Sequence, residues 1–150
     1  MTGWPAVRTD PARAPARLWP TLLVATLGTL VGAFLVGSAL SMIVAALRMV
    51  LGPTAVSNTV WAFAAGLVYS PVLSWIGLIA AAPLAVWALR RGRAGWAVAC
   101  GAGALVGLVV YGVLGGPLVE TLIFGGGTGL ALGGLYWLSA CLFAPDAFRR

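Results

Sequence analysis

The sequence predicts an all-α, polytopic membrane protein, a bundle of four transmembrane helices with both termini in the cytoplasm. Two observations predict this fold class. Hydrophobic residues make up 61% of the 150 residues and charged residues only 8%, whereas a water-soluble domain of this length needs far more charge to cover its surface. The apolar residues are also gathered into four long runs, and almost all of the arginines lie outside them.

The chain begins with a segment, 1–17, that is rich in Pro, Ala and Arg. Because Pro5, Pro11 and Pro15 block a continuous helix, we expect a disordered cytoplasmic tail. The apolar run that follows is far longer than the roughly 7–15 residues of a signal-peptide core. We therefore expect the tail to remain in the mature protein.

Each apolar run exceeds the ~18 residues that a helix needs to cross about 30 Å of hydrocarbon. Helix is required because lipid offers no partners to backbone polar groups, and the runs lack the alternation of a membrane β-barrel. Ser57–Thr59 is the expected N-cap of the second helix. The predicted transmembrane domain, 18–144, holds helices at about 18–47, 59–89, 94–114 and 118–144, and a short cytoplasmic tail follows at 145–150.

The second run, 59–89, is long enough to hold two helices broken at Pro71. The arginines argue against two crossings. With four helices and a cytoplasmic N-terminus, only Arg48 of the nine arginines lies outside, in agreement with the positive-inside rule. A split would move the arginines at 90–93 and the C-terminal pair to the outside. We therefore expect one long helix, kinked at Pro71 and Pro83.

The large aromatic residues agree with this topology. Trp19, Trp87 and Trp96 fall at predicted inner ends, and Trp61 and Tyr111 fall near predicted outer ends. Tryptophan and tyrosine favour the interface between membrane and water. The aromatic residues therefore support the topology that the arginines predict.

The most regular pattern is a four-residue spacing of small residues. Residues four apart share one helix face, and a face of small residues lets two backbones pack closely in lipid. The alternative is a glycine face that lines a pore or leaves room for lipid or pigment. The sequence leaves open whether these faces pack within the chain or between chains. The predicted packing face comprises Gly28, Gly32, Gly37, Gly103, Gly107, Gly125, Gly129 and Gly133, and the first helix also carries the ladder Ala25, Thr29, Ala33, Gly37, Ser41 and Ala45.

The glycine-rich stretch 120–137 does not match a phosphate-binding loop. A dinucleotide fingerprint that starts at Gly127 fails because Leu132 occupies the last glycine position, and a Walker loop needs a lysine, which this chain lacks. The surrounding apolar run predicts a helix there instead.

Glu120 is the only acid within or bordering an apolar run, and it follows Pro117 in the first turn of the fourth helix. Its structural interpretation is a carboxylate that meets the positive end of the helix dipole and pairs with Arg48 at the outer surface. Its functional interpretation is a carboxylate that binds an ion or a proton. The interfacial position favours the structural interpretation, because insertion there costs less than the ~2.5–3.5 kcal/mol of mid-helix.

Other polar groups are few. Ser70 and Ser74 flank Pro71 and are expected to satisfy the carbonyls that it frees. Cys100 and Cys141 lie inside apolar runs and are expected to be buried thiols. The chain has no His, three carboxylates and two cysteines, too little for a usual metal site or for a Ser/His/Asp or Cys/His set. We therefore expect no enzyme activity, metal or cofactor.

The net charge of +6 comes from arginines outside the apolar runs, so it indicates topology and no nucleic-acid partner. Abundant Ala, Gly and Arg without Lys are typical of a GC-rich bacterial genome, so we expect a multi-pass protein of the bacterial inner membrane. Much packing surface with little chemistry predicts a non-catalytic accessory or assembly subunit. Its partners would be the bilayer and itself or a larger membrane complex. The alternative is a small homo-oligomeric transporter or channel that uses Glu120.

Overall fold

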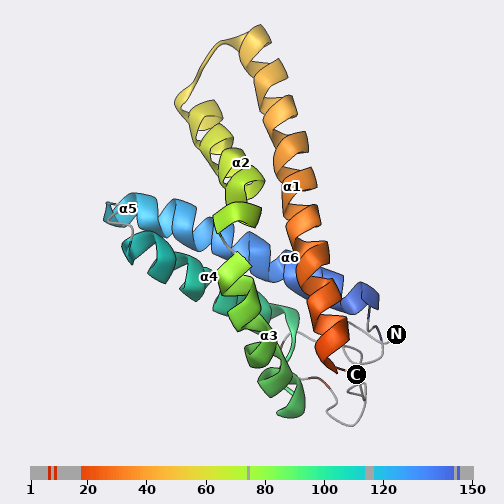
Figure 1. Ribbon diagram of the computed structural model, residues 1–150. Helices are drawn as coiled ribbons and strands as arrows, with labels where there is room; N and C mark the ends of the chain where they lie inside the picture. The colour runs from red at the N-terminus through yellow and green to blue at the C-terminus, as the bar shows by residue number, and fades with distance from the viewer. Residues whose placement is uncertain are drawn as a thin grey trace.

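The computed structural model describes residues 7, 9, 18–73, 75–113, 117–143 and 145, and the regular structure of these residues is helical throughout (Figure 1). Their order along the chain is α1 (Leu18–Leu51), α2 (Ala55–Leu73), α3 (Trp75–Arg90), α4 (Trp96–Val113), α5 (Leu118–Glu120), the π-helical segment η2 (Thr121–Gly126) and α6 (Gly127–Phe143).

Three of these helical stretches are long and apolar enough to cross a membrane: Trp19–Leu51, Trp96–Val113 and Leu118–Phe143. Large hydrophobic side chains cover much of their outer surface. In water such a surface would be costly, whereas lipid solvates it. The length and apolar surface of these helices indicate a helical membrane protein.

Helix α1 extends beyond its predicted end at residue 47. The backbone N–H of Gly52 donates to the carbonyl of Arg48 (3.0 Å), and Gly52 has a φ of 76°. This is the left-handed cap that ends many helices, and only glycine adopts it without strain. With 34 residues, α1 is about 50 Å long.

Helix α2 begins four residues before its predicted start. The N–H of Thr54 donates to Ser57 Oγ (2.9 Å), and the N–H of Ser57 donates to Thr54 Oγ1 (3.1 Å). These reciprocal bonds form a capping box. Thr54 is therefore the N-cap, where we predicted Ser57–Thr59, and Ser57 is the third residue of the helix.

The run 59–89 forms two helices in series where we expected one kinked helix. Ser74, between α2 and α3, lies outside the described residues. Pro71, near the end of α2, has no N–H to donate to the carbonyl of Leu67. Ser70 Oγ donates to that same carbonyl (2.8 Å), as predicted for Ser70. Pro83 lies within α3, which continues as a helix to Arg90.

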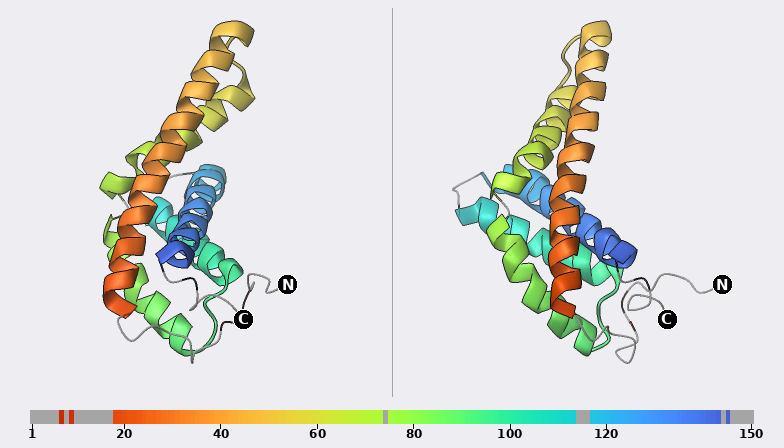
Figure 2. Two further views of the ribbon diagram at one scale, coloured as in Figure 1. Left: turned by 90° about the vertical axis from the view of Figure 1, so that its right-hand side faces the viewer. Right: turned by 45° about the vertical axis from the view of Figure 1, so that its right-hand side comes forward.

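The helices form two antiparallel hairpins (Figure 1). One pairs α1 with α2 and α3, which follow one another along α1 in the same direction. The other pairs α4 with α5, η2 and α6. Figures 1 and 2 show the hairpins meeting where α1 and α4 begin and α3 and α6 end, which we call the closed end. They splay apart toward the α1–α2 turn and toward α5, which we call the open end.

The buried core lies toward the closed end. Tyr136 and Trp137 of α6 are buried there in one cluster with residues of the first turns of α1 and the last turns of α3. The sequence places large apolar residues where three helices converge, so this is the region that holds the two hairpins together. The core consists of Leu22, Ala25, Val86, Leu89, Ala94, Tyr136, Trp137, Ala140 and Cys141.

Candidate functional site

A seam of glycines joins α4 and α6 by direct backbone contact. A methyl group on Gly103 would overlap the carbonyl oxygen of Gly129 and lie 2.9 Å from the Cα of Gly133. A methyl group on Gly129 would in turn overlap the carbonyl oxygen of Gly103. The two backbones are therefore in direct contact, as in other membrane helix pairs built from small residues.

The seam continues toward the open end. A methyl group on Gly107 would overlap the carbonyl of Gly125, and one on Gly125 would lie 2.7 Å from the Cβ of Tyr111. At these positions the glycine hydrogen points at a carbonyl oxygen of the other helix. Such Cα–H···O contacts recur where membrane helices approach closely. The glycines of the third and fourth predicted helices thus pack against each other within the chain.

The three predicted packing glycines of α1 face two different helices. A methyl group on Gly28 would lie 3.2 Å from Ser139 Oγ of α6, and one on Gly32 would lie 3.8 Å from Leu135. A methyl group on Gly37 would instead lie 2.8 Å from the backbone nitrogen of Val68 in α2. Helix α1 therefore contacts α6 near the closed end and α2 in its middle. Along the small-residue ladder, Ala25, Thr29, Ala33 and Gly37 are buried, and Ser41 and Ala45 are half-buried.

Arg48 joins the two helices of the α1–α2 turn. Its guanidinium donates to Asn58 Oδ1 and lies 5.6 Å from the centre of the Trp61 ring. A cation in the last turn of a helix is also favoured by the helix dipole. Within the described part of the chain these are the partners of Arg48, and the predicted pairing with Glu120 is not formed.

Glu120 is exposed and is the last residue of α5, immediately before η2. The six-residue π-helix Thr121–Gly126 has a wider turn than an α-helix, and π-helical turns are frequent at functional sites. Sequence reasoning did not find this segment. The run Gly125–Gly127 at its end was the available signal, because glycines tolerate an irregular turn, but such runs are common in membrane helices.

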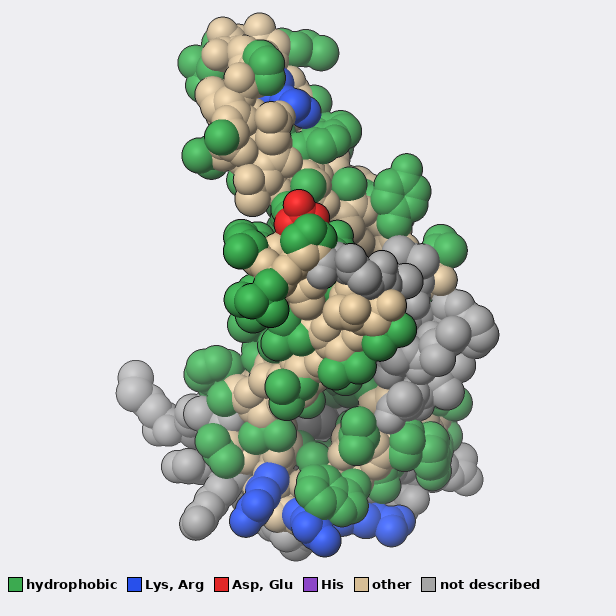
Figure 3. Space-filling model, turned by 90° about the vertical axis from the view of Figure 1, so that its left-hand side faces the viewer, with side chains coloured by type: hydrophobic (Ala, Val, Ile, Leu, Met, Phe, Trp, Pro, Cys, Tyr) green, Lys and Arg blue, Asp and Glu red, His purple; other side chains and the backbone are tan. Residues whose placement is uncertain are grey.

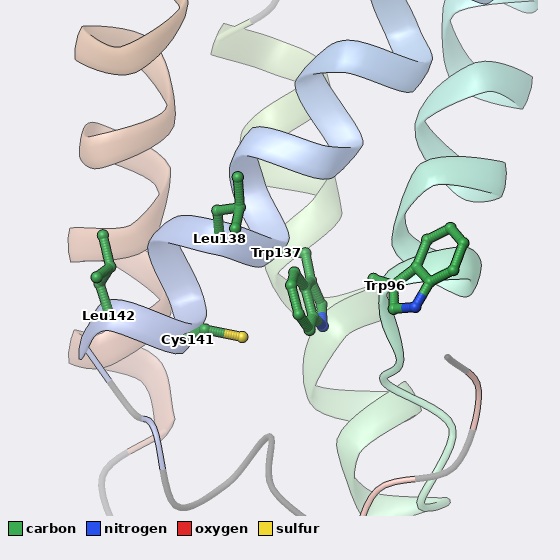
Figure 4. Close-up of a pocket in the computed structure, with 5 residues that line it drawn as sticks. All are labelled: Trp96, Trp137, Leu138, Cys141 and Leu142. Carbon is green, nitrogen blue, oxygen red and sulfur yellow. The ribbon is translucent and has the colours of Figure 1, made fainter. Parts of the chain in front are cut away.

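An apolar groove of about 490 Å³ lies at the closed end between the start of α4 and the last turns of α6. Figure 4 shows Trp96 on one side of the groove and Trp137 and Cys141 on the other. Sequence reasoning did not find it, because its walls come from segments about 40 residues apart. The groove is lined by Trp96, Trp137, Leu138, Cys141 and Leu142.

Two residues of the N-terminal segment, which we expected to be disordered, are bonded to the α3–α4 loop. The N–H of Thr9 donates to the carbonyl of Gly92 (2.9 Å), and the N–H of Gly95 donates to the carbonyl of Val7 (3.3 Å). The N–H of Ala94 donates to Thr9 Oγ1 (3.3 Å). Pro5, Pro11 and Pro15 predict that this segment forms no continuous helix, but they do not predict its contact with the α3–α4 loop.

Both cysteines are free thiols, with Cys100 half-buried and Cys141 buried. Among the described residues, no group of three or more His, Cys, Asp and Glu side chains could hold a metal ion. Compared with known proteins, the chain matches no family model, and no curated protein or solved structure is significantly similar to it.

Proposed function

We propose that this protein is a non-catalytic accessory or assembly subunit of the bacterial inner membrane. It crosses the membrane four times, with both termini in the cytoplasm. Helices α2 and α3 together make one crossing, because they run in series along α1 (Figure 1). The arginines of the α3–α4 loop then lie at the cytoplasmic side, as the positive-inside rule requires.

One observation carries the assembly role: the tip of the α1–α2 hairpin, residues 42–61, stands clear of the other helices (Figures 2 and 3). At a tilt of 40°, the upper end of the usual range, a helix of about 50 Å still spans about 38 Å. That exceeds the ~30 Å hydrocarbon layer by about 8 Å. The tip nevertheless ends in exposed Met49, Val50 and Leu51.

Apolar side chains beyond the hydrocarbon layer are stabilised when another protein covers them. The glycine seam is already filled within the chain, so it leaves no comparable surface for a partner. Arg48 holds the tip together through Asn58 and Trp61, which gives a partner a preformed two-helix surface. The tip is thus the surface through which the subunit assembles with itself or with a larger membrane complex.

The test uses two valines of equal exposure. Val50 at the tip and Val113 at the end of α4 are both 82% exposed. The protein is extracted from its own membrane in mild detergent, and the native mass is measured for wild type, Val50→Trp and Val113→Trp. We expect a mass well above the 15.3 kDa monomer for wild type and Val113→Trp, and loss of the complex for Val50→Trp. A wild-type monomer, or an equal loss in both variants, would refute the proposal.

A small homo-oligomeric transporter or channel is the second candidate, and the junction of Glu120 with η2 favours it. An exposed carboxylate beside a π-helical turn is a suitable entrance for a cation or a proton. The test is flux into vesicles that contain the purified protein. Transport that Glu120→Gln abolishes supports this candidate, and equal flux in wild type and variant removes it.

A further inference from the structure

A cluster of three arginines lies at the closed end, where the chain turns from α3 to α4. Arg90, Arg91 and Arg93 are all exposed, and Figure 3 shows arginine side chains gathered at this end of the molecule. The N–H of Arg93 donates to the carbonyl of Ala88 (2.8 Å) and the N–H of Gly92 to that of Leu89 (3.0 Å). This is a Schellman motif, and the φ of 63° at Gly92 fits it.

The backbone of this loop is fully engaged. Besides the two bonds of the Schellman motif, the N–H groups of Ala94 and Gly95 donate to Thr9 and Val7, and Thr9 is only 7% exposed. The loop is therefore a rigid support that keeps no backbone donor for a ligand. Any anion that binds here is bound by the guanidinium groups.

Arg91 is already oriented for this task. Its guanidinium stacks on the ring of Trp87, 4.3 Å from the ring centre. Stacking covers a face of the planar group and leaves its edge N–H groups available, which suits bidentate bonding to phosphate. Glu120 is the one acid among the described residues, and α5, which carries it, lies at the open end (Figure 1). The described part of the chain thus leaves the cluster without a neutralising carboxylate.

The apolar groove adjoins the cluster. Trp96, which forms one wall, follows Arg93 by three residues, so their Cα atoms lie within about 11 Å of each other. The groove volume of about 490 Å³ falls in the range of small-molecule sites, about 300–1,000 Å³. Its lining of two tryptophans, two leucines and a thiol (Figure 4) suits a hydrocarbon chain and no polar ligand.

We propose that the closed end binds an anionic phospholipid. The guanidinium groups of Arg90, Arg91 and Arg93 bond its phosphate headgroup, and an acyl chain lies in the groove beside Trp96 and Trp137. Basic clusters at the ends of membrane helices attract anionic headgroups, and the groove adds the apolar half of the ligand. The site is independent of the proposed assembly role, because it lies at the opposite end of the molecule from the tip.

The test is a titration of purified protein in detergent, read as lipid adducts by native mass spectrometry. The probes are phosphatidylglycerol, phosphatidylcholine with the same acyl chains, and glycerol 3-phosphate as the headgroup alone. The cluster variant carries Arg90→Gln, Arg91→Gln and Arg93→Gln together, and Arg48→Gln at the open end is its control. Leu142→Gln tests the groove, and Leu130→Gln, also exposed on α6, is the matched control.

We expect phosphatidylglycerol to bind at least ten times more tightly than phosphatidylcholine. The cluster variant should lose affinity on the order of 100-fold, since each arginine near a membrane surface contributes about fivefold. Leu142→Gln should weaken binding several-fold, and Arg48→Gln and Leu130→Gln should leave it unchanged. If the cluster variant does not fold, Arg93→Gln alone should lose about fivefold.

Three results would overturn the proposal. Equal binding of the two phospholipids would show that the charge of the headgroup is not recognised. Equal losses in the cluster variant and in Arg48→Gln would show a non-specific attraction. If glycerol 3-phosphate binds as tightly as phosphatidylglycerol and Leu142→Gln has no effect, the arginines bind a phosphate group alone and no acyl chain occupies the groove.

Discussion

Substituting alanine for Gly103 should separate the two backbones of the glycine seam, and Gly101→Ala is the matched control on the same helix. The methyl group of Gly103→Ala meets the carbonyl oxygen of Gly129 and backbone atoms of Gly133 at 2.9 and 3.0 Å. These are all backbone atoms, so no rotamer change relieves the overlap. A methyl group on Gly101 meets nothing within 4 Å.

The expected cost follows from the two ways in which the overlap can relax. If the helices stay in place, an overpacked methyl group costs about 1–3 kcal/mol. If they move apart, the Cα–H···O contacts nearest to Gly103 weaken, and each contributes about 0.5–1 kcal/mol. Those contacts link Gly103 with Gly129 in both directions and Gly133 with Ala99. Either way the free energy of unfolding falls by about 1–3 kcal/mol, a factor of roughly 5–150 in the equilibrium constant.

The control removes the one effect that both variants share. Replacing a helical glycine with alanine favours the helix by about 0.5–1 kcal/mol, so Gly101→Ala should be neutral or slightly stabilising. The assay is equilibrium unfolding in mixed micelles with increasing sodium dodecyl sulfate, followed by tryptophan fluorescence. If Gly103→Ala and Gly101→Ala unfold at the same detergent fraction, the seam does not hold α4 to α6, and the reasoning is wrong.

Two further substitutions test the first hairpin in the same assay. Thr54→Ala removes the N-cap that exchanges hydrogen bonds with Ser57 and should cost about 0.5–2 kcal/mol, and an unchanged midpoint would contradict the capping box. Ser70→Ala removes the donor to the Leu67 carbonyl that Pro71 leaves unpaired and should cost about 1–3 kcal/mol. The same change in a Pro71→Ala background should cost less, because the restored N–H bonds that carbonyl, so equal costs in the two backgrounds would contradict this account.

The helical class and the positions of the apolar segments could be predicted from the sequence, because hydrocarbon thickness and backbone hydrogen bonding impose them directly. Helix ends were harder to predict. Gly52 is an effective signal for the end of a helix. The prediction instead ended the helix at residue 47, because the charged Arg48 interrupts the apolar run. The capping pair Thr54 and Ser57 was missed for a similar reason, since its partners are recognised only when the helix start is known.

The contacts of the candidate site were less predictable, because they depend on which helices are neighbours. The four-residue spacing of Gly103 and Gly107 marks a packing face but does not name the helix that fills it. Arg48 and Glu120 are predicted on the same side of the membrane, but this prediction does not say how far apart they lie in the membrane plane. Because the hairpins splay apart, the helix ends that carry Arg48 and Glu120 are separated. Arg48 instead bonds Asn58 and contacts the ring of Trp61.

The point at which the hairpins part is encoded in α1. Helix α1 faces α6 with Gly28 and Gly32. The next position of this four-residue spacing is Val36, which is larger and exposed. In the ladder, Thr29, Ala33 and Gly37 are each one residue after Gly28, Gly32 and Val36, about 100° around the helix. These three small residues are buried, and Gly37 packs against the backbone of α2. Because lipid provides no hydrophobic drive for helix association, α1 follows α6 only while small residues allow close contact. Beyond Gly32, α1 packs against α2 alone, and the tip therefore stands clear of the other helices.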